Sequence, residues 1–62
     1  MTLTFRNRIP NSRQKMKTFV GCVNIHSEIY EGVVHLVFGH MGHIVAIALR
    51  DWDVEIEQGA NG

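Results

Sequence analysis

One cysteine and three histidines have side chains and spacing that could hold a metal ion. Cys22 and His26 form a C-x3-H pair, and His40 and His43 form an H-x2-H pair further along the chain. Zinc binds thiolate and imidazole groups in a tetrahedron, and a structural zinc stabilises domains whose own core is small. The pattern departs from the usual finger motif, in which the first pair is two cysteines. A small zinc-stabilised binding domain is therefore an alternative, while scattered polar histidines with Cys22 as a small core residue is the favoured interpretation.

The fourth histidine, His35, stands between valines in a segment that alternates like a strand. A lone histidine could act as a general base or a pH switch. No partner constellation accompanies it, which favours a hydrogen-bonded histidine at a half-buried face or a subunit interface. Neither Ser12 nor Ser27 lies in a nucleophile motif, and Cys22 lies inside a strand pattern. The sequence therefore predicts a protein that is not an enzyme and carries no cofactor.

Charge is distributed unevenly along the chain. The formal net charge is zero with neutral histidines, so the chain as a whole does not indicate a nucleic-acid partner. Residues 1–17 nevertheless hold cations and no acid, namely Arg6, Arg8, Arg13, Lys15 and Lys17. On a flexible arm these side chains could contact phosphates, which gives an alternative function as a nucleic-acid-binding small β-barrel. They could equally pair with the acidic face of 51–57, in the same chain or in a neighbour.

The size of the chain limits what it can bury. A domain of 62 residues buries only about 60% of its unfolded surface, so its core is marginal without a staple or a partner. The single cysteine excludes an intrachain disulfide and favours a cytoplasmic location. Residues 32–49 carry no formally charged side chain and just reach the length of a membrane span. Histidines and glycines in the middle of this segment argue against a span, so no membrane partner is expected.

Alternation of apolar and polar residues predicts four or five strands. Thr2 to Arg8 reads as a short strand or an extended arm, and Asn11 or Ser12 could cap a helical turn through Lys17. The expected strands after this point are 18–26, 29–38, 43–49 and 51–57. Connections are expected at Ser27-Glu28 and at 39–42, with a bulge or sharp bend near Arg50.

The last two of these segments differ in clarity. The segment 43–49 is apolar on both faces and is expected to be deeply buried. Helical spacing competes with strand alternation over 43–57, and the strict alternation of acids with Trp52, Val54 and Ile56 favours a strand for 51–57.

The predicted fold class is mostly β. We expect a small antiparallel sheet or an SH3-like partly open barrel of four to five strands, with one short N-terminal helical turn as an option. The chain reads as a single domain, 1–62, with a basic arm at 1–17, a β core at 18–57 and a frayed tail at 58–62.

A stretch in the middle of the chain resembles the first motif of Sm-like RNA-binding barrels. The resemblance is carried by Tyr30-Glu31-Gly32-Val33-Val34, by Phe38-Gly39-His40-Met41-Gly42 and by Ile44-Val45. It implies a small barrel. Glycines stand where that family has the Asp and Asn that help contact RNA, and no second Sm motif is present. The same stretch is similar to the glycine-rich turn of KOW-type ribosomal and transcription modules.

Apolar residues on both faces of 33–38 predict that a partner covers one face of the sheet. A second copy of the chain is the simplest such partner, so a homo-oligomer is expected. The leading hypothesis is a small protein–protein interaction module, with an accessory or inhibitor role suggested by its size. Aromatic residues dominate such contacts, and the expected partner-binding residues are Tyr30, Phe38, Trp52 and His35.

Overall fold

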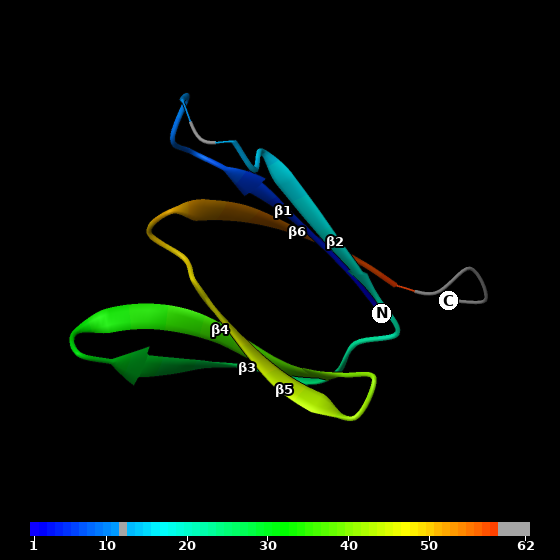
Figure 1. Cartoon of the computed structure of the whole chain (residues 1–62). Coiled ribbons are helices and arrows are strands. Elements are labelled where there is room, and N and C mark those ends of the chain that lie inside the picture. Colours follow the sequence, from blue (N-terminus) through cyan, green and yellow to red (C-terminus); the bar gives the residue numbers. More distant parts are fainter. Residues whose placement is uncertain (12, 59–62) are drawn as a thin grey trace.

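The computed structural model describes residues 1–11 and 13–58, and its regular structure consists of β-strands (Figure 1). The strands are β1 (Thr2–Asn7), β2 (Met16–Val20), β3 (Val23–Tyr30), β4 (Val33–His40), β5 (His43–Ala48) and β6 (Trp52–Glu57). They form two antiparallel sheets of three strands, in the orders β2-β1-β6 and β3-β4-β5. Figure 1 shows these sheets as two layers that face each other. The mostly β expectation is confirmed, with six strands instead of four or five.

The N-terminal segment belongs to the sheet and not to an arm. Of the two alternatives for Thr2 to Arg8, the structure has the strand, because β1 pairs with β2 on one side and with β6 on the other. Leu3 and Phe5 on this strand are 0% exposed. The expected division between a basic arm at 1–17 and a β core at 18–57 is therefore wrong, since β1 is the central strand of its sheet.

The expected strand at 18–26 is broken between β2 and β3. Gly21 has a φ of 76°, a left-handed conformation that favours glycine, and the chain passes here from one sheet to the other. The amide of Cys22 donates to the carbonyl of Met1 over 2.8 Å, which ties this crossing to the start of β1. Alternation alone did not reveal the break, because apolar residues continue through it.

Two tight turns define the β3-β4-β5 sheet, and neither lies at Ser27-Glu28, where a connection was expected. The first is Glu31-Gly32, with φ values of 50° and 77°, and the second is Met41-Gly42, with φ values of 50° and 80°. Positive φ at both central residues is typical of the type I′ turn, whose twist matches that of the strands it joins. These turns fix the register of both hairpins, so that His40 pairs with His43 across the second turn.

The prediction of an N-terminal helical turn is wrong for the part of the chain that the structure describes. Residues 13–15 have no helical structure and Met16 already begins β2. Ser12, one of the two expected capping residues, lies outside the described residues, as do residues 59–62 of the expected tail. Among the described residues there is no helix that could cross a membrane.

The C-terminal strand confirms the preference for strand over helix. Trp52–Glu57 forms β6 and pairs along its whole length with β1. The bend expected near Arg50 is present as a turn at 49–51, where the amide of Asp51 donates to the carbonyl of Ala48 over 3.3 Å. This turn carries the chain from β5 in one sheet to β6 in the other.

The core lies between the two central strands, β1 and β4. Phe5 stacks on Phe38 with ring centroids 5.9 Å apart, and Phe19 meets both rings edge-on at 5.8 and 5.1 Å. Leu3, Cys22, Leu36 and Ile47 complete the buried cluster. The expectation of a deeply buried strand at 43–49 is wrong, because β5 is an edge strand and only its Ile47 is buried.

Candidate functional site

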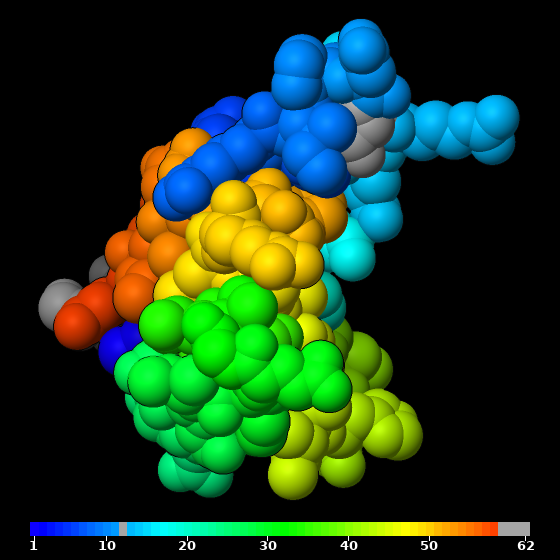
Figure 2. All heavy atoms as spheres, turned by 90° about the vertical axis from the view of Figure 1, so that its left-hand side faces the viewer, coloured from blue at the N-terminus to red at the C-terminus, as the bar shows by residue number. Residues whose placement is uncertain are grey.

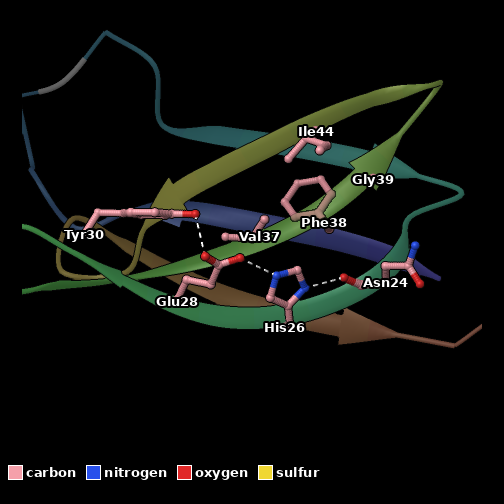
Figure 3. A pocket seen from close by; sticks show the side chains of 8 residues that line it. All are labelled: Asn24, His26, Glu28, Tyr30, Val37, Phe38, Gly39 and Ile44. Carbon is pink, nitrogen blue, oxygen red and sulfur yellow. Dashed lines mark hydrogen bonds and ion pairs between the residues drawn. The ribbon is translucent and has the colours of Figure 1, made fainter.

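A hollow lies on the outer face of the β3-β4-β5 sheet, the face turned away from the other sheet (Figure 3). Its volume is about 290 Å³, and its lining comes from all three strands: Asn24, His26, Glu28, Tyr30, Val37, Phe38, Gly39 and Ile44. Gly39 helps to shape it, because a Cβ at this position would lie 3.0 Å from Cγ2 of Val23 on the neighbouring strand. The missing side chain leaves room for Val23.

A β-bulge places the polar side chains of this face. The register between β3 and β4 shifts between Val23 and His26, and Asn24 in this interval has a φ of 53°. A bulge adds one residue to its strand and re-aims the side chains that follow. Beyond it, His26, Glu28 and Tyr30 occupy alternate positions of β3 and therefore share the outer face.

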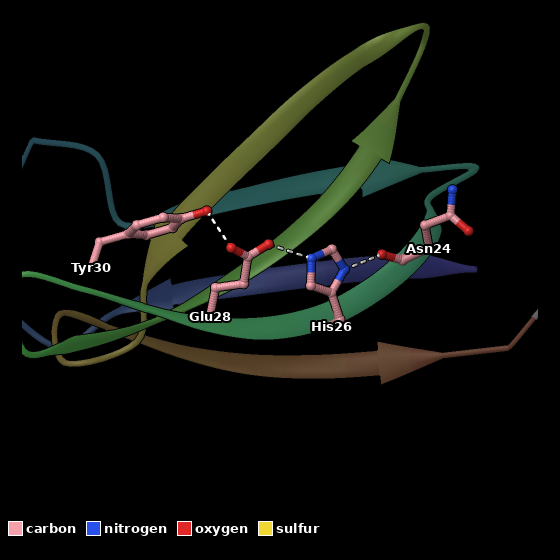
Figure 4. A network of polar contacts seen from close by, with 4 residues as sticks. All are labelled: Asn24, His26, Glu28 and Tyr30. Atoms are coloured by element: carbon pink, nitrogen blue, oxygen red, sulfur yellow. Dashed lines mark hydrogen bonds and ion pairs between the residues drawn. The ribbon is translucent and has the colours of Figure 1, made fainter.

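These side chains form a continuous polar chain (Figure 4). Nδ1 of His26 lies 2.7 Å from the carbonyl oxygen of Asn24, and its Nε2 lies 2.6 Å from Oε2 of Glu28. The hydroxyl of Tyr30 donates to Oε1 of Glu28 over 2.7 Å. A carbonyl and a carboxylate both accept hydrogen bonds, so this geometry requires a proton on each ring nitrogen. The arrangement therefore favours the imidazolium form of His26 beside an ionised Glu28.

The pKa values of the polar chain shift in the directions that this geometry implies. The hydrogen bond to the Asn24 carbonyl, followed by that to Glu28, raises the pKa of His26 above its usual 6.5. Hydrogen bonds from Tyr30 and then from His26 hold the pKa of Glu28 below its usual 4.5. The hydroxyl of Tyr30 donates a hydrogen bond to the carboxylate of Glu28, which raises the pKa of Tyr30 above its usual 10.0. These shifts favour a protonated His26, an ionised Glu28 and a neutral Tyr30, joined by the contacts in Figure 4.

His35 lies on the same outer face, between the polar chain and β5. Its Nδ1 lies 2.9 Å from the carbonyl oxygen of Val33, and its ring meets that of Tyr30 edge-on at 5.1 Å. The side chain is half-buried. The expectation of a hydrogen-bonded histidine at a half-buried face is confirmed.

The expected aromatic anchors have three different environments. Tyr30 is 44% exposed beside the hollow, as a contact residue requires. Phe38 is 1% exposed and belongs to the core, so its aromatic ring is not available to a partner. Trp52 is half-buried and packs against the core, and the ammonium of Lys17 lies 5.0 Å from the centre of its ring. Of the three, Tyr30 alone is an exposed part of the outer face.

The four residues of the zinc hypothesis are not brought together. Cys22 is buried and its thiol donates to the carbonyl of Phe19, and the ring of His40 packs edge-on against Phe19 at 5.2 Å. His40 therefore lies on the inner face of the β3-β4-β5 sheet, whereas His26 lies on its outer face. In residues 1–11 and 13–58 no three His, Cys, Asp or Glu side chains are grouped closely enough to hold a metal ion.

Two of the N-terminal cations pair with the acidic strand of the same chain. Arg6 meets Glu55 at 2.8 Å, and Arg8 meets Asp53 at 2.7 Å. Arg6 lies in β1, Arg8 follows the end of β1, and both acids lie in β6, so the expectation of pairing with the acidic face is confirmed. Arg13 and Lys15 are exposed in the loop between β1 and β2. Figure 2 shows this light-blue loop at the opposite end of the molecule from the yellow-green β4-β5 hairpin.

The open side of β5 is the feature that sequence reasoning missed. In the part of the chain that the structure describes, β5 pairs with β4 alone. The closing pair of a two-residue hairpin is hydrogen-bonded, so residues 43, 45 and 47 direct their backbone groups toward β4, and Leu49 continues this pattern by donating to Val34 at 3.0 Å. Ile44 and Ala46 therefore direct their N–H and C=O groups away from the sheet. The side chain of Ile44 is 84% exposed.

The arrangement defines a small all-β domain of two three-stranded sheets, with a hollow on one outer face and an open strand beside it. Comparison with protein-family models, with curated proteins and with solved structures finds no match.

Proposed function

We propose that the chain is a protein-interaction module that pairs β5 with a strand of a protein partner and performs no chemistry of its own. The observation that carries this proposal is the open side of β5. There the backbone N–H and C=O groups of Ile44 and Ala46 point away from β4, and the side chain of Ile44 is exposed. An open strand edge is a template for pairing with another chain. Strand addition of this kind is a common mode of peptide recognition.

The other three edge strands carry features that discourage such pairing. β6 presents Asp53, Glu55 and Glu57, and β2 contains Lys17. β3 contains Glu28 and is distorted by the bulge at Asn24. Charges and bulges are the usual means by which proteins protect their sheet edges. β5 has no formally charged residue, which makes it the edge best suited to accept a strand.

The hollow would give this edge its selectivity. In strand addition the main-chain bonds supply affinity, while pockets for alternate side chains supply specificity. Ile44 belongs both to β5 and to the lining of the hollow, and Val37 and Tyr30 lie beyond it on the same face. A partner strand with an apolar side chain turned to this face would extend the apolar part of the lining.

The polar chain supports binding more than catalysis. Both ring nitrogens of His26 and both carboxylate oxygens of Glu28 already have partners within the chain. A general base or nucleophile needs a group directed at a substrate. Here the side chains hold one another in place, which fixes the shape of one wall of the hollow.

The test is amide hydrogen exchange at single-residue resolution in the presence of an uncharged peptide of alternating threonine and valine. The peptide is N-methylated on alternate amides, so that it pairs through one edge only. We expect the peptide to slow exchange at Ile44 and Ala46 and to leave the amides of β6 unchanged. Unaltered exchange at both residues under saturating peptide, or slowing confined to another edge, would overturn the proposal.

A matched pair of variants isolates the backbone contribution. Ala46→Pro removes an N–H that points away from β4, and proline is tolerated at such edge positions. This variant should stay folded and lose the protection of Ile44. Ala46→Val keeps the N–H and should retain the protection, because a branched side chain suits a strand.

A further inference from the structure

We infer that the strand that occupies the open side of β5 is β5 of a second copy, antiparallel to the first, with the two-fold axis between the two Val45 residues. This inference rests on the proposed function and names its partner. The result is a continuous six-stranded sheet, in the order β3-β4-β5 followed by β5-β4-β3 of the second copy. Self-pairing requires that the strand complement itself in backbone direction, in side-chain size and in charge.

The backbone requirement selects the axis. A two-fold axis perpendicular to the sheet keeps the outer faces of both copies on one side. An even-numbered residue of one copy must therefore pair with an even-numbered residue of the other, and an odd-numbered residue with an odd-numbered one. With Val45 on the axis, Ile44 pairs with Ala46 of the second copy, and Ala46 pairs with its Ile44. Both residues point their N–H and C=O groups outward, so both pairs are hydrogen-bonded and the Val45 pair is not. Ala48 also faces outward by the same alternation, but its carbonyl accepts the amide of Asp51.

The neighbouring registers use the same groups less well. With Ala46 on the axis, Ile44 pairs with Ala48 of the second copy, whose carbonyl already accepts the amide of Asp51 at 3.3 Å. With Ile44 on the axis, Ala46 faces the Met41-Gly42 turn of the second copy and not a strand. Only the register through Val45 pairs Ile44 with Ala46, the two outward-facing residues whose carbonyls are not used by the turn at 49–51.

Side-chain size agrees with this register. Ile44 is 84% exposed, and Ala46 beside it is small and exposed on the same face. Pairing sets the isoleucine of each copy next to the alanine of the other, so a large side chain meets a small one twice. On the inner face Val45 meets Val45 of the second copy, next to the ring of Phe38, its partner across the β4-β5 hairpin.

Charge separates this edge from the alternatives. An antiparallel pair of β6 strands would bring acids from both copies together, and like charges directly opposite each other are destabilising. β5 has no formally charged residue, so two copies meet without repulsion. A strand this short buries a small interface, so dimerisation on the order of micromolar concentration or weaker is expected.

The two hollows lie on the same face of the joined sheet, one on each side of the axis. Ile44 lines the hollow of its own copy and packs beside Ala46 of the other. The dimer would therefore present two equivalent hollows with an apolar strip between them. This strip includes the side chain of Ile44, which is 84% exposed in the monomer.

The test combines sedimentation with cysteine crosslinking in a Cys22→Ala background. The Cα atoms of a non-hydrogen-bonded pair lie about 4.5 Å apart, which is within the roughly 4.4–6.8 Å span of disulfides. Val45→Cys should therefore form a disulfide-linked dimer under mild oxidation. Ala46→Cys should not, because the residues at 46 in the two copies are offset by about 7 Å along the strands, which places their Cα atoms beyond disulfide range.

Sedimentation velocity on the chain in the Cys22→Ala background, without a further substitution, should show a monomer–dimer equilibrium. Ala46→Pro should weaken dimerisation by at least about tenfold, because two backbone bonds are lost per dimer. Ala46→Val should change it far less. Circular dichroism of each variant checks that the sheets are intact.

The outcomes distinguish this inference from the proposed function. A monomer up to millimolar concentration, with Ile44 still protected by the threonine–valine peptide, refutes self-pairing and leaves strand addition in place. A dimer that crosslinks through Ala46→Cys and not Val45→Cys refutes the register. A dimer unaffected by Ala46→Pro places the contact on another surface and refutes the inference as a whole.

Discussion

The packing of Phe5 provides the sharpest test of the fold, because this residue belongs to the segment that the sequence predicts as an arm. Its side chain is 0% exposed and its ring lies 5.8 Å from that of Phe19 and 5.9 Å from that of Phe38. Removing a buried phenylalanine side chain costs about 3–5 kcal/mol, since the lost transfer energy is joined by a cavity. If the segment were an arm, the same change would cost almost nothing.

The expected loss is comparable with the whole stability of the chain. At about 0.05–0.15 kcal/mol per residue, a domain of 62 residues has roughly 3–9 kcal/mol. Phe5→Ala should therefore be largely unfolded at 25 °C. Phe5→Leu fills most of the space and should cost about 1–1.5 kcal/mol. Val20→Ala, at a position of β2 that is 68% exposed, is the control and should cost less than about 1 kcal/mol.

Urea unfolding followed by the fluorescence of Trp52 measures these differences. Trp52 is the single tryptophan of the chain and packs against the core, so its emission reports loss of the sheets. With a slope of about 1 kcal/mol per molar urea for a small domain, Phe5→Leu should lower the midpoint by about 1 M. All variants are compared at one protein concentration, so that self-association does not enter. A cooperative transition for Phe5→Ala within about 0.5 M of the parent would refute the central position of β1.

Three further predictions concern the turns and the surface. In an NMR titration the pKa of His26 should exceed 6.5 and should fall in Glu28→Gln. The raised pKa of His26 adds stability below 6.5 that is lost as pH rises through its folded value, and the lowered pKa of Glu28 adds stability above 4.5 that is lost on acidification. The pair should therefore stabilise most between these two pH values. Gly42→Ala should cost about 1–2 kcal/mol in urea unfolding, because φ at this position is 80° and nothing else hinders a Cβ. Arg8→Ala should cost at most about 1 kcal/mol, with less effect in high salt, because its ion pair is exposed.

Alternation of apolar and polar residues predicted a strand correctly where one face of the strand is buried and the other is exposed to solvent. Residues 51–57 alternate strictly, and β6 was predicted within one residue of its bounds. Apolar residues were expected on both faces of 33–38, and β4 has buried residues on both, with Leu36 and Phe38 on one face and Val37 on the other. The pattern carries this information because the side-chain period of a strand is two.

The strand breaks were missed because their turn residues resemble strand residues. Glu31-Gly32 lacks the Asn-Gly or Asp-Gly pair that marks a type I′ turn, so a single strand was predicted through the first turn of the hairpin. Gly21-Cys22 ends β2 without a proline or a polar cluster. In both places the glycine with positive φ was the available signal. Pairing order was beyond reach, because nothing in a local pattern tells an edge strand from a central one.

The candidate site shows the same division between local and non-local information. Tyr30 and His35 were expected to take part in a partner-binding face, and the structure places both on the outer face. The polar chain of His26 and Glu28 was not foreseen, because the expected turn at Ser27-Glu28 separated the two residues. Both residues lie beyond the bulge at alternate positions of β3 and therefore share a face. A left-handed asparagine inside a strand pattern gives little warning of the bulge in the sequence.

The four edge strands differ in charge, and this difference supports the proposal that β5 pairs with another strand. A neutral, apolar edge on a small domain invites aggregation, and natural sequences usually interrupt such an edge with a single charge. This chain has charged residues in β2, β3 and β6 and none between Gly32 and Leu49. A lysine in place of Ala46, on the exposed face, would cost little in folding because the position is not part of the core. The edge lacks even this inexpensive protection, which suits pairing with a like strand, because a lysine at 46 would face the apolar Ile44 of the second copy across the axis.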